Sequence, residues 1–136
     1  MEEKWIQWRP LENLASKYYI DSVVDMIDNF TVNLVDARSE KHKVEIVFLE
    51  GVEAYTRVDE SFRVKIIHEL GEKYGDGFYG DWTFFKVDNS AYVKWLSDQS
   101  YTWSDTRTFT HFCLISADVL LDIVTNYEPI VRHVEE

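Results

Sequence analysis

Hydrophobic and polar positions alternate along much of the first half of the chain. Segment 18–27 is rich in β-branched residues, and apolar and polar residues alternate again through 30–35, as is typical of half-buried strands. The Asp28-Asn29 pair between them tolerates the left-handed backbone of a tight turn. A polar turn is expected at 38–43, and apolar residues then alternate through 44–49. The pattern predicts three consecutive antiparallel strands.

A four-residue repeat then predicts the main helix. Phe62, Ile66 and Leu70 recur at this interval, which places their side chains on one face of a helix. We therefore expect a helix over about residues 60–74, with Gly75 suited to end it.

Two short helices and several strands complete the expected elements. Pro10 suits a first helical turn, so a helix is expected near 10–16. Asn89 or Ser90 can cap another helix near 90–98. The run 119–125 is ambiguous, but its β-branched residues favour a strand. Further strands are expected at 54–58, 82–87 and 107–115.

These elements predict an α+β fold, in which a mainly antiparallel sheet packs with the main helix. The chain has 136 residues, of which 46% are hydrophobic and 15% aromatic, and a chain of this size buries a substantial core. No repeat or linker divides it. We expect a single domain spanning residues 1–136.

The charge balance narrows the range of partners. The chain carries 14 basic and 25 acidic residues, a formal charge of −11, which repels nucleic acid and anionic membranes and favours basic partners. A single cysteine, Cys113, suits a reducing compartment. No apolar run approaches the roughly 20 residues of a spanning helix, and the acidic start does not resemble a signal peptide. We expect a cytoplasmic protein that binds neither nucleic acid nor membranes.

Residues for catalysis or metal binding do not form a recognisable motif. No two of the four histidines, His42, His68, His111 and His133, stand two or four residues apart, so no metal and no cofactor are expected. His111 and Cys113 would share a strand face, but such neighbours lie about 7 Å apart, too far for a hydrogen bond. We expect a satisfied, half-buried histidine beside a core cysteine, and no enzyme.

Glycines and aromatics gather in the middle of the sequence. Gly75, Gly77 and Gly80 predict a tightly shaped loop at 74–81, and Trp103 lies in a second, polar loop where we expect it to be exposed. Aromatic side chains rimmed by acids suit an interface with a basic protein. The residues expected to bind a partner are Asp76, Phe78, Tyr79, Asp81, Trp103 and Asp105.

Four segments also carry a resemblance to a known class of proteins. They are 46–52, 55–61, 78–85 and 127–129. In layout they resemble small bacterial immunity proteins, the antitoxins encoded beside polymorphic or contact-dependent toxins. The resemblance implies a cytosolic, non-enzymatic, acidic domain that binds and blocks a toxin domain, often a nuclease.

Two other classes of function stay open. One is a small ligand-binding module or enzyme with a pocket near 74–82 that uses Asp76, Asp81 or His111. The other is a structural subunit that forms a homodimer through an apolar sheet face.

Overall fold

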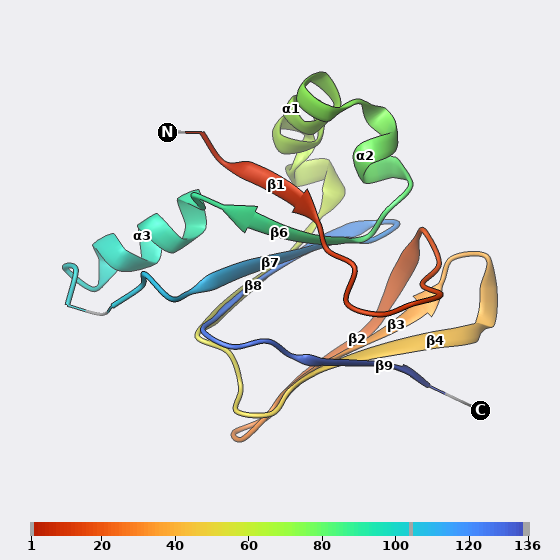
Figure 1. Ribbon diagram of the computed structural model, residues 1–136, viewed down its shortest axis with the longest axis horizontal. Helices are drawn as coiled ribbons and strands as arrows, with labels where there is room; N and C mark the ends of the chain where they lie inside the picture. The colour runs from red at the N-terminus through yellow and green to blue at the C-terminus, as the bar shows by residue number, and fades with distance from the viewer. Residues whose placement is uncertain (1, 104, 135–136) are drawn as a thin grey trace.

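The computed structural model describes residues 2–103 and 105–134. Within them, nine strands form two antiparallel sheets, and three α-helices complete an α+β fold (Figure 1). The fold class expected from the sequence is confirmed, although the strands divide between two sheets. None of the helices in the described part of the chain is long and apolar enough to cross a membrane.

The larger sheet has five strands in the order β1-β6-β7-β8-β5. All seven residues of β8 are buried, because β8 lies between two neighbouring strands and is covered on both faces. This burial explains why its sequence is a continuous apolar run rather than an alternating one. The predicted strand at 119–125 is confirmed. The bounds are β1 Lys4–Gln7, β5 Ala54–Asp59, β6 Phe84–Asp88, β7 Thr110–Ile115 and β8 Val119–Thr125.

The smaller sheet has four strands in the order β2-β3-β4-β9, so the three consecutive strands predicted from alternation are confirmed. The predicted polar turn at 38–43 is wrong, because residues 39–43 belong to β4. The backbone N–H of Arg38 donates to the Asp36 carboxylate (2.9 Å), and this contact closes a tighter turn. The bounds are β2 Tyr18–Asp25, β3 Phe30–Asp36, β4 Ser39–Phe48 and β9 Ile130–Val134.

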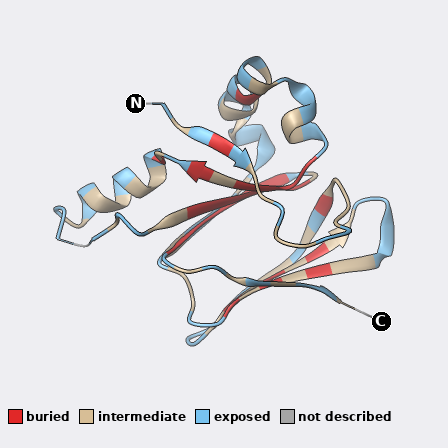
Figure 2. Cartoon of the chain, in the orientation of Figure 1, coloured by how far each residue is buried: buried red, intermediate tan, exposed pale blue. Residues whose placement is uncertain are grey.

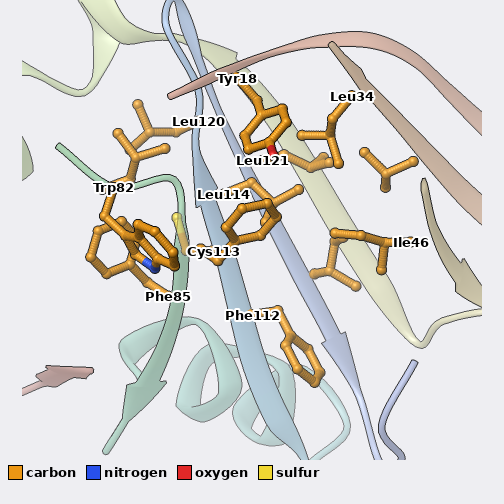
Figure 3. Close-up of a cluster of buried hydrophobic side chains, with 14 of the residues drawn as sticks. Tyr18, Leu34, Ile46, Trp82, Phe85, Phe112, Cys113, Leu114, Leu120 and Leu121 are labelled. Atoms are coloured by element: carbon orange, nitrogen blue, oxygen red, sulfur yellow. The ribbon is translucent and has the colours of Figure 1, made fainter. Parts of the chain in front are cut away.

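The core lies between the two sheets. Phe48 of β4 packs edge-on against Phe112 of β7, with ring centroids 5.8 Å apart. Buried residues follow the central strands, whereas the helices are mostly exposed or half-buried (Figure 2). Figure 3 shows labelled core side chains from both sheets, namely Tyr18, Leu34 and Ile46 from the smaller and Phe112, Leu114 and Leu121 from the larger.

The main predicted helix at 60–74 is confirmed as a 3-10 turn, Glu60–Phe62, followed by α1, Val64–Tyr74. Leu70 is its buried anchor, but Phe62 is 81% exposed, because the 3-10 turn rotates Phe62 away from the apolar stripe. The predicted helix at 90–98 is confirmed as α3, Ala91–Gln99.

The predicted helix at 10–16 is wrong. Asn13 has a left-handed φ of 60°, which a right-handed helix cannot contain. The backbone N–H of Ala15 donates to the Tyr18 hydroxyl (2.9 Å) instead of to a helical carbonyl. The segment is the connection that carries the chain from β1 in the larger sheet to β2 in the smaller one.

Candidate protein-binding site

The six residues expected to bind a partner fall into two groups. Four belong to segment 76–81, just before β6, whereas Trp103 and Asp105 follow α3, which comes after β6. Figure 1 shows the two groups at opposite ends of the larger sheet. The described structure therefore does not gather all six on one face.

Segment 76–81 is not the tightly shaped loop expected from its glycines, because most of it is helical. Gly75 alone of the three takes a positive φ, 89°, and it separates α1 from a second short helix, α2, Asp76–Gly80. Phe78 stacks on Tyr74 with ring centroids 4.3 Å apart and packs against Phe85 at 5.2 Å. Phe78 is therefore half-buried and fastens α2 to the sheet, as does Tyr79. Asp76 and Asp81 are exposed.

A half-buried lysine closes the end of α2. Lys17 Nζ donates to the backbone carbonyls of Tyr79 (2.7 Å) and Trp82 (2.9 Å). Burial lowers the pKa of Lys17 to about 8, against the opposing effect of nearby acids such as Glu60. A cation at the carbonyl end of a helix is favourable, so Lys17 holds α2 on the sheet.

The second group lies on a turn that presents aromatic rings to solvent. Tyr101 and Thr102 both have left-handed φ angles, 53° and 61°. The Thr102 N–H donates to the Ser97 carbonyl (2.9 Å), which closes the end of α3. Trp103 is 91% exposed and Tyr101 85%; the exposure expected for Trp103 is confirmed. With Trp95 of α3, which is also exposed, these residues form what we call the α3 aromatic surface.

Acidic residues accompany the α3 aromatic surface. Asp98 and Asp105 are exposed and flank it in the sequence. Arg107 donates Nε–H and Nη2–H to the two oxygens of Asp105, each at 3.0 Å. These hydrogen bonds lower the pKa of Asp105 to about 2, so this carboxylate stays ionised. The Asp105–Arg107 ion pair carries no net charge, so Asp98 supplies the acidic character beside the rings.

A buried polar network lies behind α3, and sequence reasoning did not anticipate it. His111 Nε2 donates to Asp122 (2.7 Å), and Ser90 Oγ lies 2.7 Å from His111 Nδ1. Arg63 Nη1 also donates to Asp122 (2.7 Å). Burial raises the pKa of Asp122, but His111 and Arg63 outweigh burial and lower this pKa to about 2. The network joins α3, β7, β8 and the start of α1.

The hydrogen-bonded series Ser90–His111–Asp122 has the same residue types as a hydrolase triad. Here, however, the serine is a helix cap. Ser90 is 6% exposed, and its Oγ accepts the Val93 N–H (3.1 Å) at the start of α3. The hydroxyl hydrogen is then donated to His111, so both hydrogen bonds of the Ser90 hydroxyl are made to other residues of the fold. The network stabilises the packing of α3 on the sheet.

The pocket considered for a ligand or enzyme does not bring its three residues together. Asp76 lines a cleft of about 220 Å³ beside α1, and neither Asp81 nor His111 lines that cleft. His111 is satisfied by Ser90 and Asp122, as expected, but it is 4% exposed and therefore buried rather than half-buried. Burial raises the pKa of the Cys113 thiol.

Residues 2–103 and 105–134 contain no group of three or more His, Cys, Asp or Glu side chains placed to hold a metal ion.

No protein-family model, curated protein or solved structure is significantly similar to the chain. The function is therefore inferred from the residues of the chain itself.

Proposed function

We propose that this chain is a non-enzymatic, cytoplasmic interaction protein of the immunity type, which binds and neutralises a basic toxin domain. The observation that carries the proposal is the α3 aromatic surface. Trp103 and Tyr101 are among the most exposed large side chains of the described residues, and they stand on a turn with consecutive left-handed residues.

The turn is costly for the isolated chain. A non-glycine residue in the left-handed region costs on the order of 1 kcal/mol, and Tyr101 and Thr102 both occupy it. An exposed tryptophan also leaves a large apolar area in water. A partner that buries Trp103 would remove this second cost, and tryptophan and tyrosine are the side chains that most often anchor protein interfaces.

The charge of the chain favours a basic partner. A formal charge of −11 attracts a positively charged protein and raises its association rate. A toxin domain that acts on nucleic acid needs basic residues to hold phosphates. An acidic protein bound over those residues would exclude the substrate, which is how this chain would neutralise a nuclease.

Growth protection tests the proposal. The proposal expects a large secreted protein with a basic, toxic C-terminal domain to be encoded beside this chain. That domain is expressed together with the chain, and survival of the host cells is measured. We expect the wild-type chain to protect, Trp103→Ala to lose protection, and Phe62→Ala to retain it. Phe62 is the matched control because its ring is similarly exposed but lies between β5 and α1. Failure of the wild-type chain to protect, or full protection by Trp103→Ala, would contradict the proposal.

A further inference from the structure

Two histidines that are far apart in the sequence meet at the edge of the smaller sheet. His42 is on β4 and His133 is on the neighbouring strand β9. His42 Nε2 lies 3.1 Å from His133 Nδ1, and the rings are stacked with centroids 5.2 Å apart. The two nitrogens face each other at a short distance.

The other nitrogen of each ring faces an oxygen acceptor. His42 Nδ1 lies 3.3 Å from an oxygen of Asp36, and His133 Nε2 lies 2.8 Å from the backbone carbonyl of Glu12. A carboxylate and a carbonyl only accept hydrogen bonds, so these two nitrogens carry the ring hydrogens. In the neutral rings, the facing nitrogens then both present lone pairs, an arrangement that a cation between them would stabilise.

We propose that His42 and His133 bind a divalent transition-metal ion of the zinc class through His42 Nε2 and His133 Nδ1. Zn–N bonds of about 2.0–2.1 Å and the observed separation of 3.1 Å correspond to an N–Zn–N angle of about 98°. This N–Zn–N angle lies between the ligand–metal–ligand angles of square-planar and tetrahedral coordination. A small movement of the exposed His133 ring would reach either geometry.

The surroundings match those of histidine metal ligands. Such ligands usually donate their remaining N–H to a carboxylate or a backbone carbonyl, which are the roles of Asp36 and the Glu12 carbonyl. His133 is exposed, so water can fill the remaining coordination positions. The buried Tyr18 hydroxyl accepts the Ala15 N–H and lies 3.4 Å from His42 Nε2, to which it donates its own hydrogen. Zinc would displace this long hydrogen bond.

A metal here would connect three parts of the chain, namely β4, β9 and the connection that contains Glu12. No metal is expected from the sequence, whereas this proposal includes one. The sequence does not reveal the site because the two histidines stand 91 residues apart, and only the pairing of β4 with β9 brings them together. Two protein ligands are fewer than a structural zinc site has, so we expect reversible binding.

Calorimetric titration of the protein with zinc chloride tests the site. We expect one zinc per chain for wild type and at least about 100-fold weaker binding for His133→Ala, because a single histidine cannot chelate. Asp36→Asn should weaken binding by about 10–100-fold through loss of the carboxylate that orients His42. His68→Ala is the control and should bind like wild type, because His68 is an exposed histidine on α1 paired with Glu72.

A shared proton is the competing explanation of the short nitrogen–nitrogen distance. ¹⁵N NMR of the histidine rings in the wild-type protein distinguishes a bound zinc ion from a shared proton. This test does not depend on how well a variant folds. Zinc should shift His42 Nε2 and His133 Nδ1 and leave His68 unshifted. The proposal is overturned by wild-type protein that binds no zinc at about 1 mM, by equal binding in His133→Ala, or by ring nitrogens that keep a shared proton in the presence of zinc.

Discussion

At the scale of single residues, Asp122 is a buried charge on which several elements depend. Its carboxylate is almost fully buried and receives hydrogen bonds from His111 and Arg63, each at 2.7 Å. A buried ion is tolerated only when such partners replace water. Changes at either partner should therefore alter the stability of the whole sheet.

The depressed pKa of Asp122 predicts a loss of stability in acid. The folded-state pKa is about 2, below the ordinary value of 3.8, so the stabilisation is present above about pH 4 and is lost as the pH falls towards 2. Its size is about 2–3 kcal/mol, from about 1.4 kcal/mol per pKa unit. Urea unfolding of the wild-type protein and of Asp122→Asn measures the stabilisation that the ionised Asp122 carboxylate provides. We expect the difference in unfolding free energy between them to shrink from pH 7 to about pH 2, and a constant difference would refute this origin.

Removal of Arg63 should leave a buried carboxylate uncompensated. We expect Arg63→Met to lower the free energy of unfolding by about 3 kcal/mol. The matched variant Arg107→Met breaks the exposed pair with Asp105 and should change the free energy of unfolding far less, because water screens exposed charges. Denaturant titration of both variants compares them. Equal effects would mean that burial does not strengthen the Arg63–Asp122 pair.

At the scale of elements, α3 is attached to the sheet by its cap. Ser90 accepts the Val93 N–H and contacts His111 within the fold. We expect Ser90→Ala to destabilise the protein by about 2–3 kcal/mol, the sum of a lost cap and an unsatisfied buried nitrogen. Asp59→Ala removes an exposed cap of the 3-10 turn and should destabilise the protein distinctly less, because no buried partner is left unsatisfied. Thermal unfolding monitored by circular dichroism distinguishes them, and similar losses would count against the role of His111.

Elements with a strong local signal could be predicted from the sequence. The hairpin turn at Asp28-Asn29, the apolar stripe of α1 and the cap of α3 each depend on neighbouring residues, and each is found. The strands β1 and β9 were missed because each is short and pairs with a distant segment. Trp5 of β1, for example, is opposite Val87 of β6, and no local pattern reveals such a partner.

Errors arose where tertiary contacts override local propensity. Pro10 is compatible with a helix start, but the connection to the second sheet requires Asn13 in the left-handed region. The glycines of 74–81 signalled a loop, yet Lys17 and the stacked ring of Phe78 fold the segment into α2. These contacts span more than 60 residues for Lys17, so the sequence around α2 does not contain them.

At the scale of the whole molecule, the sheets decide which candidate residues meet. The exposure of Trp103 could be predicted from its polar neighbours in the sequence alone. The His111–Asp122–Arg63 network and the His42–His133 pair could not, because Arg63 stands 59 residues from Asp122 and His42 stands 91 residues from His133. The same arrangement separates segment 76–81 from Trp103 (Figure 1), so one interface of ordinary shape would use the α3 aromatic surface rather than both.

Association kinetics with the basic toxin domain that the proposal expects to be encoded beside the chain test the central claim most directly. At about 50 mM and about 500 mM NaCl, we expect the association rate constant of the wild-type chain to fall by at least tenfold while the dissociation rate constant changes little. Trp103→Ala should weaken the affinity by about 30-fold at both salt concentrations, and Phe62→Ala should match wild type. An association rate that ignores salt, together with unchanged affinity in Trp103→Ala, would contradict a steered, aromatic-anchored interface.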